Sequence, residues 1–322
     1  MRRTGLLLLL AGVAAAGLLI ARSELGDIAA AFASLGIGGF ALVGAVHVVL
    51  IGVMGLAWGA LARGIHPWIW FVWGRLVRDG TAEVLPLSQL GGFVFGSRAL
   101  VLAGSSARFA AAATVVDVTM ELVAQLVYTL LGLGLLALLK PGSALEMPAL
   151  AALLGMAALC VLFVVAQRHG LASVERAIAG LTRMLFGEQA QVGSLRATIG
   201  DLHGNRGNLT LCFGLHLACW ILVGCETWLM LRLLGAPVGL AAALVIDSLL
   251  SGLRSMAFMV PQALGVQEGG YMLLGALFGV SQEAALALSL VRRARDIAIG
   301  APVLLVWQWA EGRRALGGAA SS

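Results

Sequence analysis

Long apolar runs separated by short polar connections constrain this chain more than any other feature of its sequence. Most of these runs approach or exceed the roughly 20 apolar residues that a helix needs to cross the hydrocarbon core of a bilayer. Across the chain, 60% of the residues are hydrophobic and only 11% are charged, whereas soluble domains have about 25% charged residues. We therefore expect an all-α, polytopic transmembrane helical bundle. Its helices are expected at 6–21, 37–62, 67–85, 87–103, 106–139, 147–166, 209–234, 238–260, 262–278 and 281–309.

The positions of the arginines predict the topology of this single integral membrane domain. Residues 167–207 contain arginines at amphipathic spacing, which indicates a cytoplasmic loop. Both termini are then expected on the cytoplasmic side of a bacterial inner membrane. The first span fits either a retained anchor or a cleaved signal peptide. The predicted divisions are an N-terminal span and linker (1–36), repeat A (37–139), a connecting span and loop (140–207), repeat B (208–311) and a cytoplasmic tail (312–322).

A shift of the sequence by 175 residues aligns one half of the chain with the other, so that Pro86 falls on Pro261 and Gly104 falls on Gly279. The order of the apolar segments also repeats: a full span, a helix that ends at a proline, a second helix and a long helix. Because one extra span separates the two units, the second unit should enter the membrane from the opposite side. We therefore predict two inverted repeats, which many transporters use to form a site that opens to either side.

The two repeated prolines mark expected breaks in the helices. A proline removes a backbone donor and ends a helix, so the neighbouring backbone groups need partners in protein, water or ligand. We predict broken or re-entrant helices at Pro86 and Pro261, with Gly91, Gly92 and Gly265 as further break residues. Two ordinary pairs of short spans with tight proline turns would fit the same pattern.

Charged residues near the middle of the last long helix are costly in a bilayer and therefore informative. Each unpaired charge costs about 2.5–3.5 kcal/mol at the centre of a membrane helix. Arg292, Arg295 and Asp296 share one face of that helix. Asp117 and Glu121 share one face of the matching helix in the first half. We expect the two faces to meet, either as a scaffold of ion pairs or as a site whose guanidinium groups also hold an anionic headgroup.

The remaining polar residues argue against several other functions. The basic residues are dispersed through apolar helices, so binding to nucleic acid is not expected. The four cysteines all lie in apolar runs and are interpreted as small buried hydrophobes. His47 and His216 stand singly in apolar spans without supporting carboxylates nearby, and are interpreted as helix-packing residues rather than proton carriers. No metal site, catalytic residue or cofactor is expected.

Several motifs resemble those of a known membrane family. The stretch VPQALGVQEGG followed by RARD resembles the C-terminal signature of the flippase-like family, which is also named for the membrane region of lysylphosphatidylglycerol synthase. Together with LPLSQLGGFVFGSRAL and VVDVTMELVAQLVYTLLGL, it is similar to the subgroup associated with hopanoid biosynthesis. The similarity covers nearly the whole chain. Many relatives have PGGxGxxE where this chain has PQALGVQE.

The resemblance implies an all-helical bundle that binds a lipid or moves it between leaflets. It also implies a shared functional core made of residues from both halves of the chain. These residues are Pro86, Gly91, Gly92 and Arg98 from the first half, and Pro261, Gly265, Glu268, Arg292, Arg295 and Asp296 from the second half. Members that transfer an aminoacyl group carry a soluble synthase domain after the membrane region, and that activity is not expected here.

The sequence favours a lipid translocase or lipid-handling transporter for hopanoid or polyisoprenoid lipids, which exposes a central polar cavity alternately to each side. Glu268 is then expected to present its carboxylate to the cavity at the helix break. An intramembrane transferase is an alternative, with Glu268, Asp117 or Glu121 as acid or base. A scaffold for hopanoid biosynthetic enzymes is a third possibility. The expected partners are a membrane lipid of the hopanoid, phospholipid or polyprenyl type, and proteins of hopanoid biosynthesis.

The inverted repeat predicts that Gly104 lies on the inner side of the membrane and Gly279 on the outer side. Single cysteines at these positions, in a chain whose native cysteines have been replaced, should react with a membrane-impermeant maleimide from opposite sides of sealed vesicles. Reaction of both positions from the same side would contradict the inverted repeat.

Overall fold

The fold is all-helical, which confirms the predicted class. The computed structural model describes residues 25–84, 88–169, 193–257, 260 and 263–319, and these form helices and short turns without a strand. The predicted span at 6–21 and the prolines Pro86 and Pro261 lie outside the described residues. The helices are α2 (Leu25–Ala60), α3 (Trp68–Val84), α4 (Ser88–Leu102), α5 (Ala107–Leu139), α6 (Glu146–His169), α8 (Gly193–Gly204), α9 (Arg206–Leu233), α10 (Leu240–Met256), α11 (Val266–Leu277) and α12 (Gln282–Ala319).

Four of the described helices have the length and the apolar composition needed to cross a membrane. They are α2 from Leu35 onward, α5, α6 as far as Val165, and α9. Each of them agrees with a predicted span. These helices make the chain a multi-pass membrane protein.

The helices on either side of the predicted breaks are shorter. α3 and α10 have 17 residues each, α4 has 15 and α11 has 12. At 1.5 Å per residue they reach about 18–26 Å, which is less than the roughly 30 Å thickness of the hydrocarbon core. The lengths favour broken or re-entrant helices over pairs of complete spans.

A glycine and a serine precede each of the long helices α5 and α12. Gly104 and Gly279 have φ angles of 103° and 82°, a left-handed conformation that residues with a Cβ atom rarely adopt. Two residues later, the hydroxyls of Ser106 and Ser281 each accept a hydrogen bond of 3.2 Å from the backbone N–H group three residues further on. The two matching sequence segments therefore form the same local structure.

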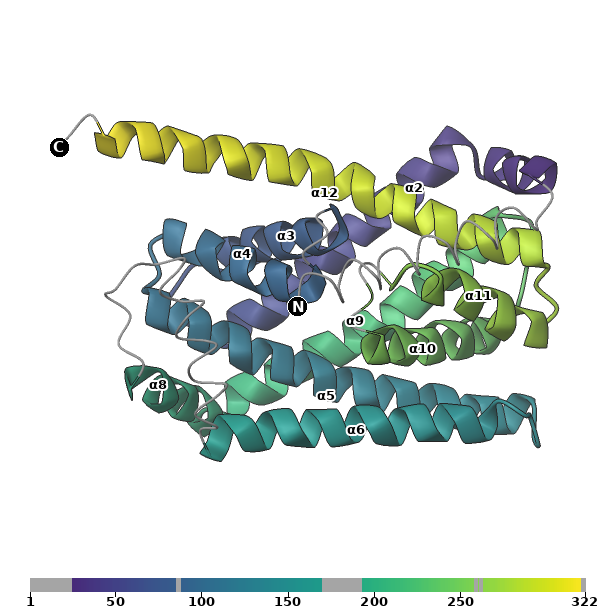
Figure 1. The fold of residues 1–322 in the computed structure, drawn as a ribbon, viewed down its shortest axis with the longest axis horizontal. Coiled ribbons are helices and arrows are strands. Elements are labelled where there is room, and N and C mark those ends of the chain that lie inside the picture. The colour runs from purple at the N-terminus through teal and green to yellow at the C-terminus, as the bar shows by residue number, and fades with distance from the viewer. Residues whose placement is uncertain (1–24, 85–87, 170–192, 258–259, 261–262, 320–322) are drawn as a thin grey trace.

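Each long helix packs against helices from the other half of the chain. α5 packs against α9 and α10, whereas α12 packs against α2 and α3. Figure 1 shows α12 along one edge of the bundle and α5 with α6 along the opposite edge. Helices α2, α3, α4 and α5 correspond to α9, α10, α11 and α12, in that order. Wherever two of these eight helices pack together, their two counterparts also pack together. This pattern agrees with two repeats, and their inversion across the membrane stays a prediction.

The predicted boundaries are wrong at both ends of the described chain. Residues 25–35 are helical rather than part of a linker, and a kink at Gly36, with a φ angle of 61°, joins them to the rest of α2. At the other end, α12 continues to Ala319, beyond the predicted end of the last span. Good helix formers such as alanine, arginine and leucine favour this extension. Glu311 within it also pairs with Arg98 of α4 at 2.7 Å.

Gly55 allows α2 and α3 to approach each other closely, because a Cβ atom at this position would lie 2.5 Å from the Cα atom of Val72. Gly55→Ala should therefore lower the free energy of unfolding by about 1–3 kcal/mol. The measurement is the thermal unfolding transition of the purified protein in detergent.

Gly52, in the same helix, is the matched control, since a Cβ atom there would meet nothing within 4 Å. Gly52→Ala should leave the transition unchanged or raise it, because alanine favours a helix more than glycine does. Equal losses for Gly52→Ala and Gly55→Ala would contradict the close packing of α2 on α3.

Candidate functional site

Charged side chains of α3 and α5 form the first of two buried clusters. Arg75 and Arg78 lie three residues apart in α3 and share one face of that helix. Arg75 donates hydrogen bonds of 3.0 and 2.8 Å to Glu121 and one of 2.8 Å to Asp79. Arg78 donates one of 2.9 Å to Asp117 and one of 2.5 Å to Glu121. These charge-assisted bonds compensate both guanidinium groups inside the bundle.

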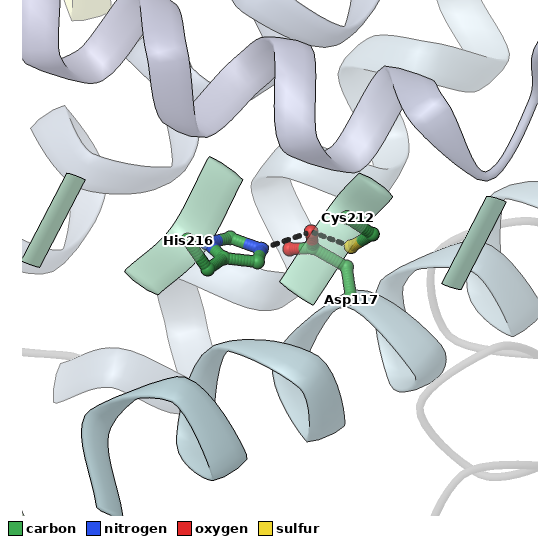
Figure 2. A group of neighbouring side chains, drawn as sticks. All are labelled: Asp117, Cys212 and His216. Atoms are coloured by element: carbon green, nitrogen blue, oxygen red, sulfur yellow. Dashed lines mark hydrogen bonds and ion pairs between the residues drawn. The ribbon is translucent and has the colours of Figure 1, made fainter. Parts of the chain in front are cut away.

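The other oxygen of Asp117 faces α9. Asp117 Oδ1 lies 2.8 Å from Nε2 of His216 and 4.0 Å from Sγ of Cys212 (Figure 2). The second ring nitrogen of His216 lies 3.2 Å from the sulfur of Met54. α9 therefore completes a group that we call the first cluster. It consists of Arg75, Arg78, Asp79, Asp117, Glu121 and His216.

Asp117, Cys212 and His216 are also kinds of side chain that bind metal ions, and their ligand atoms lie within 4.8 Å of one another. A cation placed between them would face the guanidinium group of Arg78, which is bonded to the same carboxylate. Both oxygens of Asp117 already have partners in the protein. We therefore interpret the three residues as a hydrogen-bonded part of the first cluster.

The second cluster is centred on α12. Arg295 lies 2.7 Å from Glu226 of α9 and 2.7 Å from Asp296, its neighbour in the chain. His47 of α2 lies between the same two carboxylates, 3.1 Å from Glu226 and 3.6 Å from Asp296. Residues from α2, α9 and α12 thus meet in one group of charges.

Arg292 extends this group towards α10 and α11. It donates a hydrogen bond of 2.9 Å to Asp247 and one of 2.6 Å to the hydroxyl of Tyr271. Asp247 also accepts hydrogen bonds from Thr227 at 2.8 Å and from Tyr128 at 3.1 Å. Tyr128 belongs to α5, so this buried aspartate connects both halves of the chain. We call His47, Glu226, Asp247, Arg292, Arg295 and Asp296 the second cluster.

Glu268 holds the start of α11. One of its oxygens accepts a hydrogen bond of 2.8 Å from the backbone N–H group of Gly265. The other accepts hydrogen bonds from Ser289 at 3.0 Å and Arg293 at 2.8 Å. The residue is only 2% exposed, so the prediction that its carboxylate faces a cavity is wrong for this conformation. The physical reason is that α11 begins inside the bundle, where its unpaired N–H groups need an internal acceptor.

A charged pair connects the ends of α3 and α10. Glu83 lies 3.4 Å from Arg254, and each of the two side chains is 21% exposed. Glu83 also interacts electrostatically with Asp296 and Arg293, so the pair adjoins the second cluster. We call Glu83 and Arg254 the tip pair, because each lies in the last turn of a short helix that ends at a predicted break.

The glycines predicted to mark helix breaks have different environments. Gly265 has a φ angle of 79° and immediately precedes α11, where the break was expected. Gly91 and Gly92 instead lie inside α4, which corrects their assignment as break residues. A Cβ atom on Gly92 would lie 2.6 Å from the carbonyl oxygen of Arg78. This glycine is therefore required for the close packing of α4 on α3.

The predicted contact between the charged faces of α5 and α12 is wrong. Asp117 and Glu121 pair with arginines of α3. Arg292 and Arg295 pair with carboxylates of α10, α9 and α12 itself. The physical reason is the position of the two long helices, which run along opposite edges of the bundle (Figure 1). Each finds its charge partners on the short or central helices.

The interpretation of His47 and His216 as residues without nearby carboxylates is also wrong, since each lies within 3.1 Å of one. The four-residue spacing of Cys212 and His216 places both on one face of α9, which is a signal in the sequence. Their carboxylate partner, however, comes from α5, 99 residues away from His216. Cys160, Cys212 and Cys219 are buried as expected, whereas Cys225 is half-buried.

Comparison with known families gives one match that spans nearly all of the helices. The model of the family described as lysylphosphatidylglycerol synthase TM region matches residues 5–303. The chain belongs to this family. Comparisons with curated proteins and with solved structures give no match.

Membership of the lysylphosphatidylglycerol synthase TM region family relates the membrane function of this chain to lipids. The matched residues include every member of both clusters and the tip pair. The clusters therefore belong to the membrane region that defines the family.

The first cluster predicts strong coupling between Asp117 and Arg78. Asp117→Arg should lower the free energy of unfolding by about 3–5 kcal/mol, because it brings like charges together in a buried site. Adding Arg78→Asp should recover part of this loss, since the pair of residues 78 and 117 is restored with its signs exchanged while the bond from Arg78 to Glu121 is lost. Thermal unfolding of the single and double variants in detergent measures the coupling.

Arg292→Asp provides the control, because Arg292 pairs with Asp247 instead. Combined with Asp117→Arg, it should add its own loss without any recovery. Recovery with Arg292→Asp but not with Arg78→Asp would reject the observed pairing.

Proposed function

We propose that this protein moves a membrane lipid between the two leaflets of the bilayer. The observation that carries the proposal is the position of the two charge clusters, each of which joins helices from both halves of the chain. Charged groups inside membrane proteins are costly, and they typically mark substrate or ion pathways. The family's relation to membrane lipids makes a lipid the substrate class.

The packing of the two halves is suited to alternating access. The contacts of α2–α5 correspond to those of α9–α12, so a conformation in which the halves exchange environments can retain a similar set of contacts. In the present conformation, the arginines of both clusters are compensated by carboxylates of the protein. We therefore propose that this is an occluded state, in which the polar groups are closed against one another.

The tip pair is the proposed point of opening. Glu83 and Arg254 are joined at 3.4 Å and are more exposed than the arginines of the two clusters. Arg254 and the neighbouring Arg293, whose side chain is 18% exposed, supply guanidinium groups of the kind that bind phosphate oxygens. Separation of the tip pair would offer the guanidinium group of Arg254 to an anionic headgroup, close to the one that Arg293 holds against Glu268.

The contacts of the carboxylates support transport over a transferase reaction. An acid or base must be able to reach the reacting group with a proton to give or take. Asp117, Glu121 and Glu268 each hold a guanidinium group instead. The same carboxylates are therefore better suited to joining helices than to proton transfer on a substrate.

The motifs VPQALGVQEGG and RARD support hopanoid or polyisoprenoid lipids as the substrate class, through their similarity to relatives associated with hopanoids. The test is a reconstitution into vesicles of phosphatidylethanolamine and phosphatidylglycerol. One set contains a trace of fluorescent phosphatidylglycerol, and another contains a hopanoid with a free amine. In vesicles with this protein, an impermeant quencher or amine reagent should react with nearly all of the transported lipid. In vesicles with an unrelated helical membrane protein, it should react only with the lipid of the outer leaflet. If the reagents reach the same fraction of each lipid in vesicles with this protein as in vesicles with the unrelated protein, translocation is rejected.

The tip pair predicts that a bridge between α3 and α10 stops transport. Glu83→Cys and Arg254→Cys, in a chain without native cysteines, should react with a reducible bifunctional thiol reagent. Lipid transfer should then fall to the level of protein-free vesicles and return after reduction. Each single cysteine variant, treated in the same way, is the matched control. Unchanged transfer by the bridged protein would show that the two tips need not separate.

A further inference from the structure

His47 has a carboxylate oxygen opposite each of its ring nitrogens. Nδ1 lies 3.1 Å from Oε2 of Glu226, on α9. Nε2 lies 3.6 Å from Oδ1 of Asp296, on α12. An imidazole that belongs to α2 therefore bridges two acidic side chains from two other helices.

Both contacts are favourable when the imidazole carries two protons, because Nδ1 then donates to Glu226 and Nε2 lies at ion-pair distance from Asp296. An ionised carboxylate accepts hydrogen bonds and donates none, whereas a neutral imidazole has one N–H group and one bare nitrogen. In either neutral tautomer, the bare nitrogen would point its lone pair at a carboxylate oxygen. The imidazolium form has an N–H group for both Glu226 and Asp296, and it is attracted to both charges.

The charges around His47 lead to the same protonation state. Glu226 and Asp296 share the guanidinium group of Arg295, so one cation faces two anions. Arg292, three residues before Arg295 in α12, is bonded to Asp247. A proton on His47 supplies the missing positive charge.

The helices that pack against α2 are α3, α5, α9 and α12. α9 supplies Glu226, and α12 supplies Arg295 and Asp296. α3 supplies Glu83, which acts on Asp296 electrostatically. On α3 and α5, Arg75, Arg78, Asp79, Asp117 and Glu121 belong to the first cluster, and Arg108 lies in the first turn of α5.

We propose that His47, Glu226 and Asp296 form a proton-binding site, and that the proton bound there is the ion coupled to lipid movement. The coupling rests on the proposed lipid translocation, whereas the binding of the proton rests on the geometry alone. The His47 side chain is 18% exposed, in contrast to the fully buried His216.

Loss of the proton would loosen the junction of α2 with α9 and α12. Glu226 and Asp296 would then face each other across a neutral ring with only Arg295 between them. The released proton passes to solvent, and no bond other than N–H is broken. Because Asp296 also interacts with Glu83, the change in charge reaches the tip pair.

The first test measures the proton without any transport. Protein labelled with nitrogen-15 in its histidines is reconstituted into vesicles of phosphatidylethanolamine and phosphatidylglycerol and recorded by solid-state NMR at pH 8, where an exposed histidine with a pKa of about 6.5 is mostly neutral. We expect an imidazolium signal that His47→Gln removes and His66→Gln retains. An imidazolium signal that is absent, or that His47→Gln leaves unchanged in intensity, overturns the proton-binding site.

The second test measures coupling in the same vesicles. An imposed pH gradient should speed the transfer of fluorescent phosphatidylglycerol or of the amine-bearing hopanoid several-fold, and His47→Gln should abolish this stimulation. His47→Lys keeps a positive charge and should keep the thermal unfolding transition of the wild type, yet it should abolish the stimulation as well, which separates coupling from loss of folding. His66→Gln should respond like the wild type. Transfer that ignores the gradient overturns the coupling, whereas an imidazolium signal without any lipid transfer rejects the proposed translocation and leaves the proton site standing.

Discussion

The compensation of buried charge is the constraint on which the rest of this structure depends. Arg75, Arg78, Arg292 and Arg295 are each at most 7% exposed, and an uncompensated charge inside a membrane helix costs about 2.5–3.5 kcal/mol. Each guanidinium group therefore requires at least one carboxylate. Since most of these carboxylates lie on other helices, the charges connect α3 with α5, and α12 with α9 and α10. Apolar packing alone would not distinguish these arrangements, because lipid tails are as apolar as leucine side chains.

The exchange of the long helices places both clusters where the two halves of the chain meet. α5 belongs to the first half of the chain but packs against α9 and α10 of the second half. α12 belongs to the second half but packs against α2 and α3 of the first half. Small residues permit these approaches. A Cβ atom on Gly80 would lie 3.1 Å from the Cα atom of Gly300, at the contact of α3 with α12. Each cluster contains side chains from both halves of the chain. A movement of one half therefore changes the surroundings of the charged side chains of the other half, and coupled transport requires such a link.

The sequence predicts the helices of this protein well because their signals are local. Apolar length, the glycines with positive φ angles and the serine caps at Ser106 and Ser281 all act within a few residues. The partners of the charges are not local. The match of Asp117 to Arg292 after a shift of 175 residues shows that the positions are equivalent, but equivalent residues touch only when they lie close to the axis that relates the two halves. In the structure, α2 and α9 pack against each other as such a pair, whereas α5 and α12 lie at opposite edges (Figure 1). Glu268 shows the same limit, since its charge is evident from the sequence and its hydrogen bond to Gly265 depends on where α11 starts.

The central claim, that each long helix packs on the other half of the chain, is tested most directly by a disulfide between α5 and α10. A Cβ atom built on Gly132 lies 2.8 Å from the Cβ atom of Ser248, so a small adjustment would bring the two to the roughly 3.8 Å of a disulfide. In a chain without native cysteines, Gly132→Cys and Ser248→Cys are combined with a protease site between α6 and α8, and the two fragments are separated by electrophoresis after oxidation and cleavage. We expect the fragments to remain joined until a reductant is added. If the protein is folded and has no free thiols left after oxidation, but the two fragments still separate without a reductant, the exchanged packing of the long helices is contradicted.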